Sequence, residues 1–375
     1  MQKSKMQKSK KHKGGKHMKV TVMGSTNKGT KEDFNIFGGH CAGICYMPDN
    51  FEKILTEKEE KTLKRVKRTM VGGHHSVFDH CFINLYIEGI PKFVAMLINN
   101  EKMYVTSEKS ARYTVMKDVS ELEKTKYEKW KDIFQGLIGK EKLAMENARY
   151  LISAMTPTSM AYTVSYRQIN YLYQWLKKEA HWGESVWGPA CEELCDELEK
   201  TGFIEEEIKD QKQRSLSMLG SKEEVIDAPE YFGDVYSTCY MGSLAQLAQA
   251  QRHKTLDYKI WMGEMEFYVP PIIAGSKYEK EWLEDYEGIL LPQGGMYWIR
   301  ERGTKENFIL KCKERLCSAA QLEIAQQTKY TLEKYINNGN KDLDVYNHGA
   351  RCTFPDFTCT EPCGWTEGIK LERKF

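Results

Sequence analysis

Two groups of residues, far apart in the chain, have the side chains that bind anions. Residues 108–113 read Glu-Lys-Ser-Ala-Arg-Tyr, a polar loop in which a hydroxyl and a guanidinium stand two residues apart. Residues 249–254 read Gln-Ala-Gln-Arg-His-Lys, in which three basic side chains follow two amides. Arginine offers a planar fork to phosphate, and hydroxyls and backbone N–H groups fill the remaining oxygens. Because one anion site needs such groups together, the separation suggests a duplicated domain whose copies each keep part of a site.

Composition places the chain among globular proteins. It has 375 residues, 41% hydrophobic and 29% charged, and this length favours two domains. The net charge of +2 argues against nucleic-acid binding by the chain as a whole. No apolar run reaches the roughly 20 residues that span a bilayer, and no signal peptide is visible. We therefore interpret the eleven cysteines as reduced thiols and expect a cytoplasmic protein.

Hydrophobic periodicity predicts the elements that carry these groups. Ahead of the first polar loop we expect strands at 18–23 and 82–88 and helices at 57–70 and 92–98. After it we expect helices at 121–138, 142–155 and 167–178. The second half should have a strand at 234–241, a helix at 243–254, a mixed segment at 258–269 and one long helix at 305–337. The order of strand, helix, polar loop and long helix thus recurs in both halves.

Together the two groups resemble the signature of the flavin-dependent thymidylate synthases, a helix ending in Arg-His-Arg followed closely by Ser-x-Arg-Tyr. In the first half, residues 75–80 resemble the family's histidine-to-histidine segment, and residues 99–102 (Asn-Asn-Glu-Lys) stand in the slot of the basic triplet. In the second half, Gln249 and residues 252–254 match the glutamine and the triplet, with lysine for the final arginine. No Ser-x-Arg-Tyr follows them.

Three arginines extend the resemblance. Residues 315–324 resemble the family's late helix and put Arg315 on a substrate-binding arginine. Arg149 and Arg167 match two other family arginines, while Leu176 stands where the first half would have its counterpart of Arg315. Each half therefore has only part of the family's set.

The resemblance implies an α/β (α+β) fold with two fused copies, each a mainly antiparallel sheet packed with long helices. We expect a disordered basic leader at 1–17, a first copy at 18–219, a second, diverged copy at 220–340 and a Cys-rich tail at 341–375. In the family, subunits of a homotetramer share each active site. A homodimer of fused chains would have the same four domains, with two active sites.

The implied reaction is transfer of one carbon to C5 of dUMP or a related pyrimidine nucleotide. Reduced FAD would supply hydride, NADPH would reduce the flavin, and the folate methylenetetrahydrofolate would donate the carbon. The carried-over substrate residues, of which Ser110 and Arg315 are also expected to be catalytic, are Glu108, Ser110, Ala111, Arg112, Arg149, Gln249 and Arg315. Those carried over for the flavin are Ser76, Asp79, Arg167, Arg252, His253 and Lys254.

Two other functions stay open at this point. A flavoenzyme with the same ligands could make another modified pyrimidine nucleotide, for example by hydroxymethylation. A catalytically inactive relative could bind nucleotide or nucleic acid through the retained arginines and the basic leader.

The tail has a separate candidate site. Four potential soft ligands, sufficient for tetrahedral zinc or an iron–sulfur cluster, stand close together at His348, Cys352, Cys359 and Cys363. Their spacing matches no standard zinc finger, so free or disulfide-forming thiols are an equal alternative.

Overall fold

The computed structural model describes residues 17–110, 118–181 and 185–360. Residues 1–16, most of the expected leader, lie outside this range. The described chain combines helices with two four-stranded antiparallel sheets, which confirms the predicted fold class. The first sheet has the order β1-β2-β4-β3, from β1 (Lys19–Ser25), β2 (Phe82–Pro91), β3 (Tyr104–Glu108) and β4 (Pro157–Ser165). The second has the order β5-β6-β8-β7, from β5 (Tyr231–Phe232), β6 (Val235–Ser243), β7 (Asp257–Phe267) and β8 (Gly295–Thr304).

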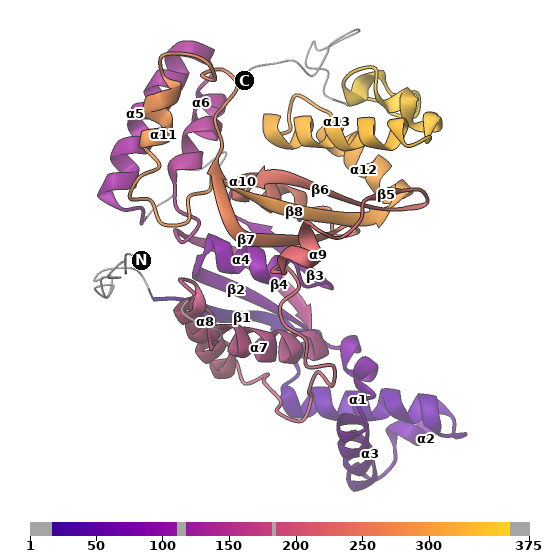
Figure 1. Cartoon of the computed structure of the whole chain (residues 1–375). Helices are drawn as coiled ribbons and strands as arrows, with labels where there is room; N and C mark the ends of the chain where they lie inside the picture. Colours follow the sequence, from indigo (N-terminus) through magenta and orange to yellow (C-terminus); the bar gives the residue numbers. More distant parts are fainter. Residues whose placement is uncertain (1–16, 111–117, 182–184, 361–375) are drawn as a thin grey trace.

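The strand order is the same in both sheets, and the helices repeat with it. The second strand of each sheet leads into α4 (Lys92–Asn99) or α10 (Leu244–Ala250). The fourth leads into the pair α7 (Tyr166–Ala180) and α8 (Gly188–Lys200), or the pair α12 (Lys305–Arg315) and α13 (Leu322–Asn337). In Figure 1 α7 and α8 lie below the first sheet, α4 lies between the sheets, and α12 and α13 lie above the second.

Hydroxyl side chains at the strand ends explain why a helix begins there. Ser165 ends β4 and accepts a hydrogen bond from the backbone N–H of Gln168, which caps α7. Ser243 ends β6 and caps α10 in the same way, and Thr304 ends β8 and caps α12. A serine or threonine at this position satisfies an N–H group that the first turn of a helix leaves unbonded.

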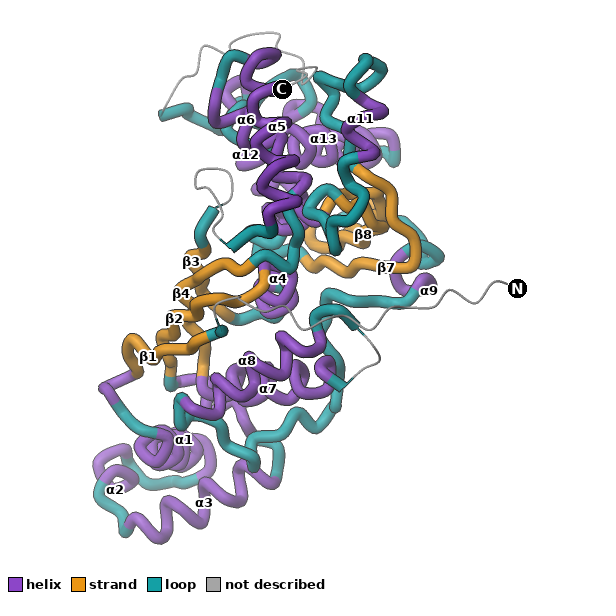
Figure 2. The backbone as a smooth tube through the Cα atoms, turned by 90° about the vertical axis from the view of Figure 1, so that its left-hand side faces the viewer, coloured by secondary structure: helices purple, strands orange, loops and turns teal. Residues whose placement is uncertain are grey.

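Other helices lie at the two ends of the molecule (Figure 2). One end has α1 (Lys31–Tyr46), α2 (Phe51–Leu55) and α3 (Glu59–Val71). The opposite end has α5 (Glu121–Ile138), α6 (Glu141–Ala148) and α11 (Glu279–Glu284). The shorter elements are η1 (Thr26–Lys28), η2 (His75–His80), η3 (Arg149–Leu151), α9 (Lys222–Val225), η4 (Lys341–Tyr346) and η5 (Arg351–Thr353).

The two halves pack as one body. Trp130 of α5 meets Trp282 of α11 edge to face, with ring centres 4.9 Å apart, and its indole N–H donates to Asp285 over 2.7 Å. Backbone bonds also cross between the halves, because the N–H of Ala154 donates to the carbonyl of Leu291 over 2.7 Å. These contacts fix the positions of the two halves relative to each other, on both sides of any site between them.

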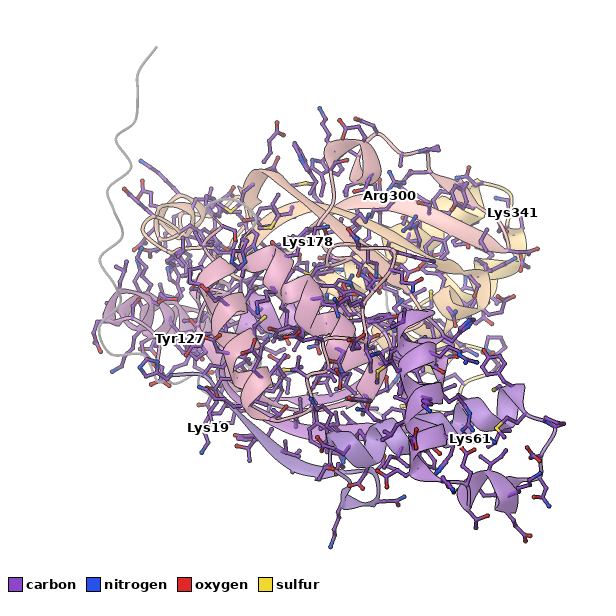
Figure 3. The ribbon with its side chains drawn as sticks, turned by 90° about the horizontal axis from the view of Figure 1, so that it is seen from below. Lys19, Lys61, Tyr127, Lys178, Arg300 and Lys341 are labelled. Carbon is purple, nitrogen blue, oxygen red and sulfur yellow. The ribbon has the colours of Figure 1, made fainter. Side chains whose placement is uncertain are left out.

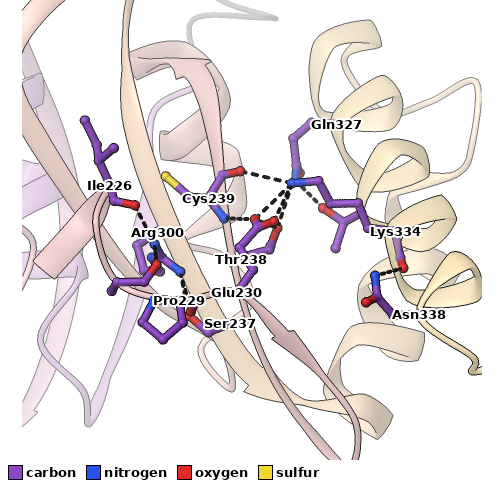
Figure 4. Close-up of polar contacts among 12 residues, drawn as sticks. Ile226, Pro229, Glu230, Ser237, Thr238, Cys239, Arg300, Gln327, Lys334 and Asn338 are labelled. Carbon is purple, nitrogen blue, oxygen red and sulfur yellow. Dashed lines mark hydrogen bonds and ion pairs between the residues drawn. The ribbon is translucent and has the colours of Figure 1, made fainter. Parts of the chain in front are cut away.

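The segment between the halves is fastened at several points. Lys178 of α7, which Figure 3 labels in the view from below, donates to the carbonyl of Gln213 over 3.0 Å. Further along, the 2% exposed Arg300 of β8 donates to the carbonyls of Val225, Ala228 and Pro229 (Figure 4). Residues 225–229 are therefore bound to the second sheet.

Several predicted boundaries are wrong. The helix expected at 142–155 ends at Ala148, and the one expected at 243–254 starts after its Ser243 cap and ends at Ala250. The mixed segment at 258–269 is mostly β7. The expected helix at 305–337 is two helices, because residues 316–321 leave the helical path.

A tertiary contact accounts for that break. The carbonyl of Leu316 accepts the backbone N–H of Arg351 over 2.7 Å instead of continuing the helical ladder. The side chain of Gln321, only 1% exposed, turns into the interior. Helical periodicity cannot register either contact, because both depend on residues distant in the sequence.

Candidate functional site

A cavity of about 420 Å³ lies between the two halves, and its size falls in the range of ligand pockets. Its lining from the first half comprises Asn99, Tyr104, Thr106, Ser107 and Glu108, mostly on β3. Its lining from the second half comprises Ala248, Gln251, Arg252 and Lys254, at and beyond the end of α10. The two polar groups that the sequence separates thus share one cavity, at Glu108 and at the basic triplet.

The charges around this cavity favour an anion. Arg252 and Lys254 are both exposed and both line the cavity. Nζ of Lys254 donates to the backbone carbonyl of Tyr104 over 2.9 Å, and it lies 4.9 Å from the centre of the Tyr104 ring. The one carboxylate among the described lining residues, Glu108, is paired with Lys92 at 2.7 Å.

The middle residue of the triplet turns away from the cavity. His253 is only 6% exposed and is absent from the cavity lining. Its Nε2 lies 2.7 Å from Nε of Arg315, at the end of α12. Burial, with the positive charges of Arg315 and Lys311, lowers the pKa of His253 to about 2, so the imidazole is neutral.

A buried polar group joins Arg149 of the first half to Gln249 of the second. Both donate to Oε1 of Gln321, Arg149 through Nη2 and Gln249 through Nε2, the latter over 2.8 Å. Because arginine has only donors, the oxygen of Gln321 must face it, and the nitrogen of Gln249 must face that oxygen. Among the described residues, Oε1 of Gln249 is then a buried acceptor with no donor.

The buried carboxylate of Glu323 extends this group of polar contacts. Glu323 accepts the hydroxyls of Tyr150 over 2.8 Å and of Ser243 over 2.6 Å, and the amide of Gln321 donates to Tyr150. Burial raises the pKa of Glu323, and these hydrogen bonds offset part of that effect. The network therefore crosses from one half to the other.

Arg315 connects the histidine to the glutamine. Its Nη2 donates to the backbone carbonyl of Gln249 over 3.4 Å, while its Nε is bonded to His253. Arg149, Gln249, His253 and Arg315 therefore belong to one contiguous set of polar contacts, beside a cavity that Arg252 and Lys254 line.

The other predicted flavin residues form a separate group. Arg167, at the start of α7, pairs with Asp79 at 2.5 Å, and Ser165 donates to the same carboxylate over 2.7 Å. Ser76 is exposed in η2 nearby in sequence. None of these lines the cavity described above.

The predicted phosphate loop is only partly described. Ser110 is half-buried and follows β3 directly, beyond the lining residue Glu108. Ala111 and Arg112 lie outside the described residues.

The tail gives no support for a metal in the described range. His348 and Cys352 are exposed and Cys359 is half-buried, while Cys363 lies outside the described residues. Within residues 17–110, 118–181 and 185–360, no three His, Cys, Asp or Glu side chains are grouped as metal ligands.

The counterpart of the cavity, where the end of α4 meets β7, is built differently. Lys102 donates to the carbonyl of Leu256 over 2.7 Å, mirroring the bond from Lys254 to Tyr104. Next to it, the 1% exposed Glu101 accepts the backbone N–H of Ser217 and the guanidinium of Arg214, each over 2.6 Å. Residues 214–220 therefore cover this position.

Sequence reasoning missed the residues that hold the site together. Gln321, Tyr150 and Ser243 were not among the predicted site residues. Their only signal is a polar side chain within an otherwise buried stretch, which a single sequence does not separate from an ordinary cap or turn.

Comparisons with known proteins match part of the chain. Residues 39–186 match the family model described as "Thymidylate synthase complementing protein". A flavin-dependent thymidylate synthase of Pyrococcus furiosus is 24% identical over 163 residues, which cover 36% of this chain and 65% of that protein. The match therefore spans less than two thirds of that relative's length.

Two solved structures resemble about half of the chain. A UMP/dUMP methylase, PolB from Streptomyces cacaoi bound with 5-Br dUMP, is 14% identical with a TM-score of 0.37, covering 50% of this chain and 90% of its own. A flavin-dependent thymidylate synthase, ThyX from Helicobacter pylori complexed with FAD and dUMP, is 15% identical with a TM-score of 0.35, covering 51% and 100%. No helix in the described part of the chain is both long and apolar enough to cross a membrane.

Proposed function

We propose that this protein is a flavin-dependent enzyme that transfers one carbon to C5 of dUMP or a related pyrimidine nucleotide. The observation that carries the proposal is the cavity of about 420 Å³ with β3 on one side and the basic end of α10 on the other. It brings Glu108 of the first group together with Arg252 and Lys254 of the second. The family match over residues 39–186 supports the same proposal independently.

The donor set fits a flavin dinucleotide. Arg252 and Lys254 offer two positive charges at the cavity, suited to the phosphates of FAD. When bound and reduced, the flavin would supply hydride, and NADPH would be its reductant. Lys254 gives a point charge where the family has a bidentate arginine, so Arg252 would contribute more of the binding.

The nucleotide would lie against the polar network. Ser110, Arg112 and Arg149 are suited to its phosphate, because together they offer a hydroxyl and two guanidinium groups. Gln249 and Arg315 would contact the pyrimidine, where Arg315 would stabilise negative charge that develops on the ring. The protein would thus contribute positioning and electrostatics, with a folate such as methylenetetrahydrofolate as the carbon donor.

Two fused copies, at 18–219 and 220–340, account for this division. The identical strand order of the two sheets supports the duplication. Each chain would have one composite site, since residues 214–220 cover the counterpart position. A homodimer of such chains, in the cytoplasm, follows from the same reasoning.

The test uses the purified full-length protein. It should be yellow, and with reduced flavin it should release tritium from 5-labelled dUMP. A colourless protein that still binds dUMP would contradict an enzymatic role. A yellow protein that releases no tritium would favour another pyrimidine nucleotide as substrate.

A further inference from the structure

We propose that His253 is a positioning residue for Arg315 and does not contact the flavin. The inference rests on the proposed function, because that function gives Arg315 its role. It begins from the burial of His253, which is 6% exposed and lies outside the cavity lining, between two residues that line it.

The bond between the two side chains has only one chemical arrangement. Nε2 of His253 lies 2.7 Å from Nε of Arg315. Arginine has no acceptor, so the guanidinium must donate and the imidazole nitrogen must accept. An imidazole accepts only through an unprotonated nitrogen, so His253 is neutral with its proton on Nδ1.

The groups around the imidazole preserve that state. From α12, Arg315 and Lys311 bring positive charges, and the carboxylate of Glu314 lies 3.7 Å away with a side chain 58% exposed. Lys311 is itself paired at 2.6 Å with Glu301, both fully buried. Burial lowers the pKa of Lys311, and the carboxylate of Glu301 opposes this effect. On the histidine's own segment, Arg252 and Lys254 add no negative charge. The pKa of His253, lowered to about 2 by burial and the two cations, agrees with this arrangement.

This contact fixes the orientation of the arginine. The guanidinium is planar, so a bond at Nε restricts rotation of the whole group. The second bond, from Nη2 to the carbonyl of Gln249 over 3.4 Å, holds the same plane against α10. His253 thereby holds Arg315 next to the glutamine whose side chain meets Arg149.

The direct measurement is nitrogen NMR of the full-length protein with labelled histidine. His253 should have an unprotonated Nε2 and a protonated Nδ1, unchanged between pH 6 and 8. A protonated Nε2 at pH 7 would overturn the proposal. This result does not depend on activity, so it separates failure of the proposal from failure of the proposed function.

Two substitutions test the consequence. His253→Gln keeps a side-chain acceptor and should retain most of the turnover. His253→Leu should lower kcat roughly tenfold to hundredfold, because misplacement of a catalytic group costs that much, while flavin absorbance and KM stay nearly constant. Gln246→Leu, which removes a buried side chain from the neighbouring helix α10, is the matched control and should leave kcat unchanged.

Three outcomes would contradict the positioning role. One is loss of flavin from His253→Leu with unchanged kcat after reconstitution. Another is equal loss of kcat in the glutamine and leucine variants. The third is a loss of the same size in Gln246→Leu, which would mean that any buried change in or next to α10 has this effect.

Discussion

The end of α10 toward β3 and the end of α4 toward β7 share a framework and differ in chemistry. In each, a lysine donates to a carbonyl at the start of the opposite strand, Lys254 to Tyr104 and Lys102 to Leu256. In each, the residue before the lysine accepts from an arginine. That residue is the neutral His253 beside α10 and Glu101 beside α4.

The difference shows how few side chains separate an open cavity from a closed structural contact. Beside α10 the first position of the triplet is Arg252, and a cavity remains open. Beside α4, Glu101 binds Arg214 and Ser217, and residues 214–220 run along β7, with the N–H of Ile260 donating to the carbonyl of Met218 over 2.7 Å. An acidic side chain there disfavours an anionic ligand and fastens the covering segment instead.

The largest expected effect is on the closed side. Glu101→Ala removes a buried acceptor from the N–H of Ser217 and from Arg214, and should cost roughly 3 kcal/mol of unfolding free energy. Flavin affinity should not change, because Glu101 is not among the residues that line the open cavity. Denaturant titration and flavin titration measure the two quantities. A loss of flavin at constant stability would mean that the closed side also binds ligand.

On the open side, Arg252→Ala should raise the flavin Kd about thirtyfold. This corresponds to roughly 2 kcal/mol for a lost charge-assisted contact. Arg214→Ala, on the closed side, is the matched control and should leave the Kd unchanged. If both variants weaken flavin binding equally, the two ends do not differ in function.

Acid should destabilise the protein through His253. Because the folded imidazole has a pKa of about 2 and the unfolded one about 6.5, only the unfolded chain takes up this proton below pH 6.5. The contribution of His253 to the unfolding free energy is therefore fully present above pH 6.5. Below that pH it falls by roughly 1.4 kcal/mol per pH unit, which is a loss of roughly 2 kcal/mol at pH 5. His253→Gln should remove this part of the slope. Equal slopes in both proteins, measured by denaturation at pH 7 and pH 5, would contradict a neutral buried His253.

The smallest expected effects are those of Lys102 and Lys254, which occupy corresponding positions in the two halves. Lys102→Ala and Lys254→Ala should each cost about 1 kcal/mol of unfolding free energy, because each removes a hydrogen bond to a carbonyl. Lys102→Ala also removes an exposed ion pair with Asp257, which adds little. Only Lys254→Ala should also weaken flavin binding, by severalfold, since only Lys254 lines the cavity. Identical flavin affinities in the two variants would remove Lys254 from the site.

Local patterns could predict much of this arrangement. Helices such as α5 and α7 and strands such as β2 follow from periodicity. The sharing of a site by Glu108 and the basic triplet follows from the complementary remnants in the two halves. Both predictions depend on short-range order or on residue chemistry that the sequence displays directly.

The remaining parts depend on contacts between distant segments. Gln321 enters the site because the expected helix breaks at residues 316–321, where Arg351 takes the carbonyl of Leu316. His253 faces Arg315 because α10 ends at Ala250, so the triplet lies on a turn and its members diverge. Residues 214–220 cover the end of α4 toward β7. No local sequence pattern predicts this, since the segment is held there by contacts with Glu101 and with β7, which are distant in the sequence.

The central claim is one composite site per chain, and ligand stoichiometry tests it most directly. Native mass spectrometry of the full-length protein, loaded with FAD and dUMP, should give one flavin and one nucleotide per chain. In the Arg252→Ala variant the flavin should be lost, while in Lys102→Ala it should remain. Two flavins per chain, or a flavin that survives Arg252→Ala and is lost from Lys102→Ala, would contradict the account.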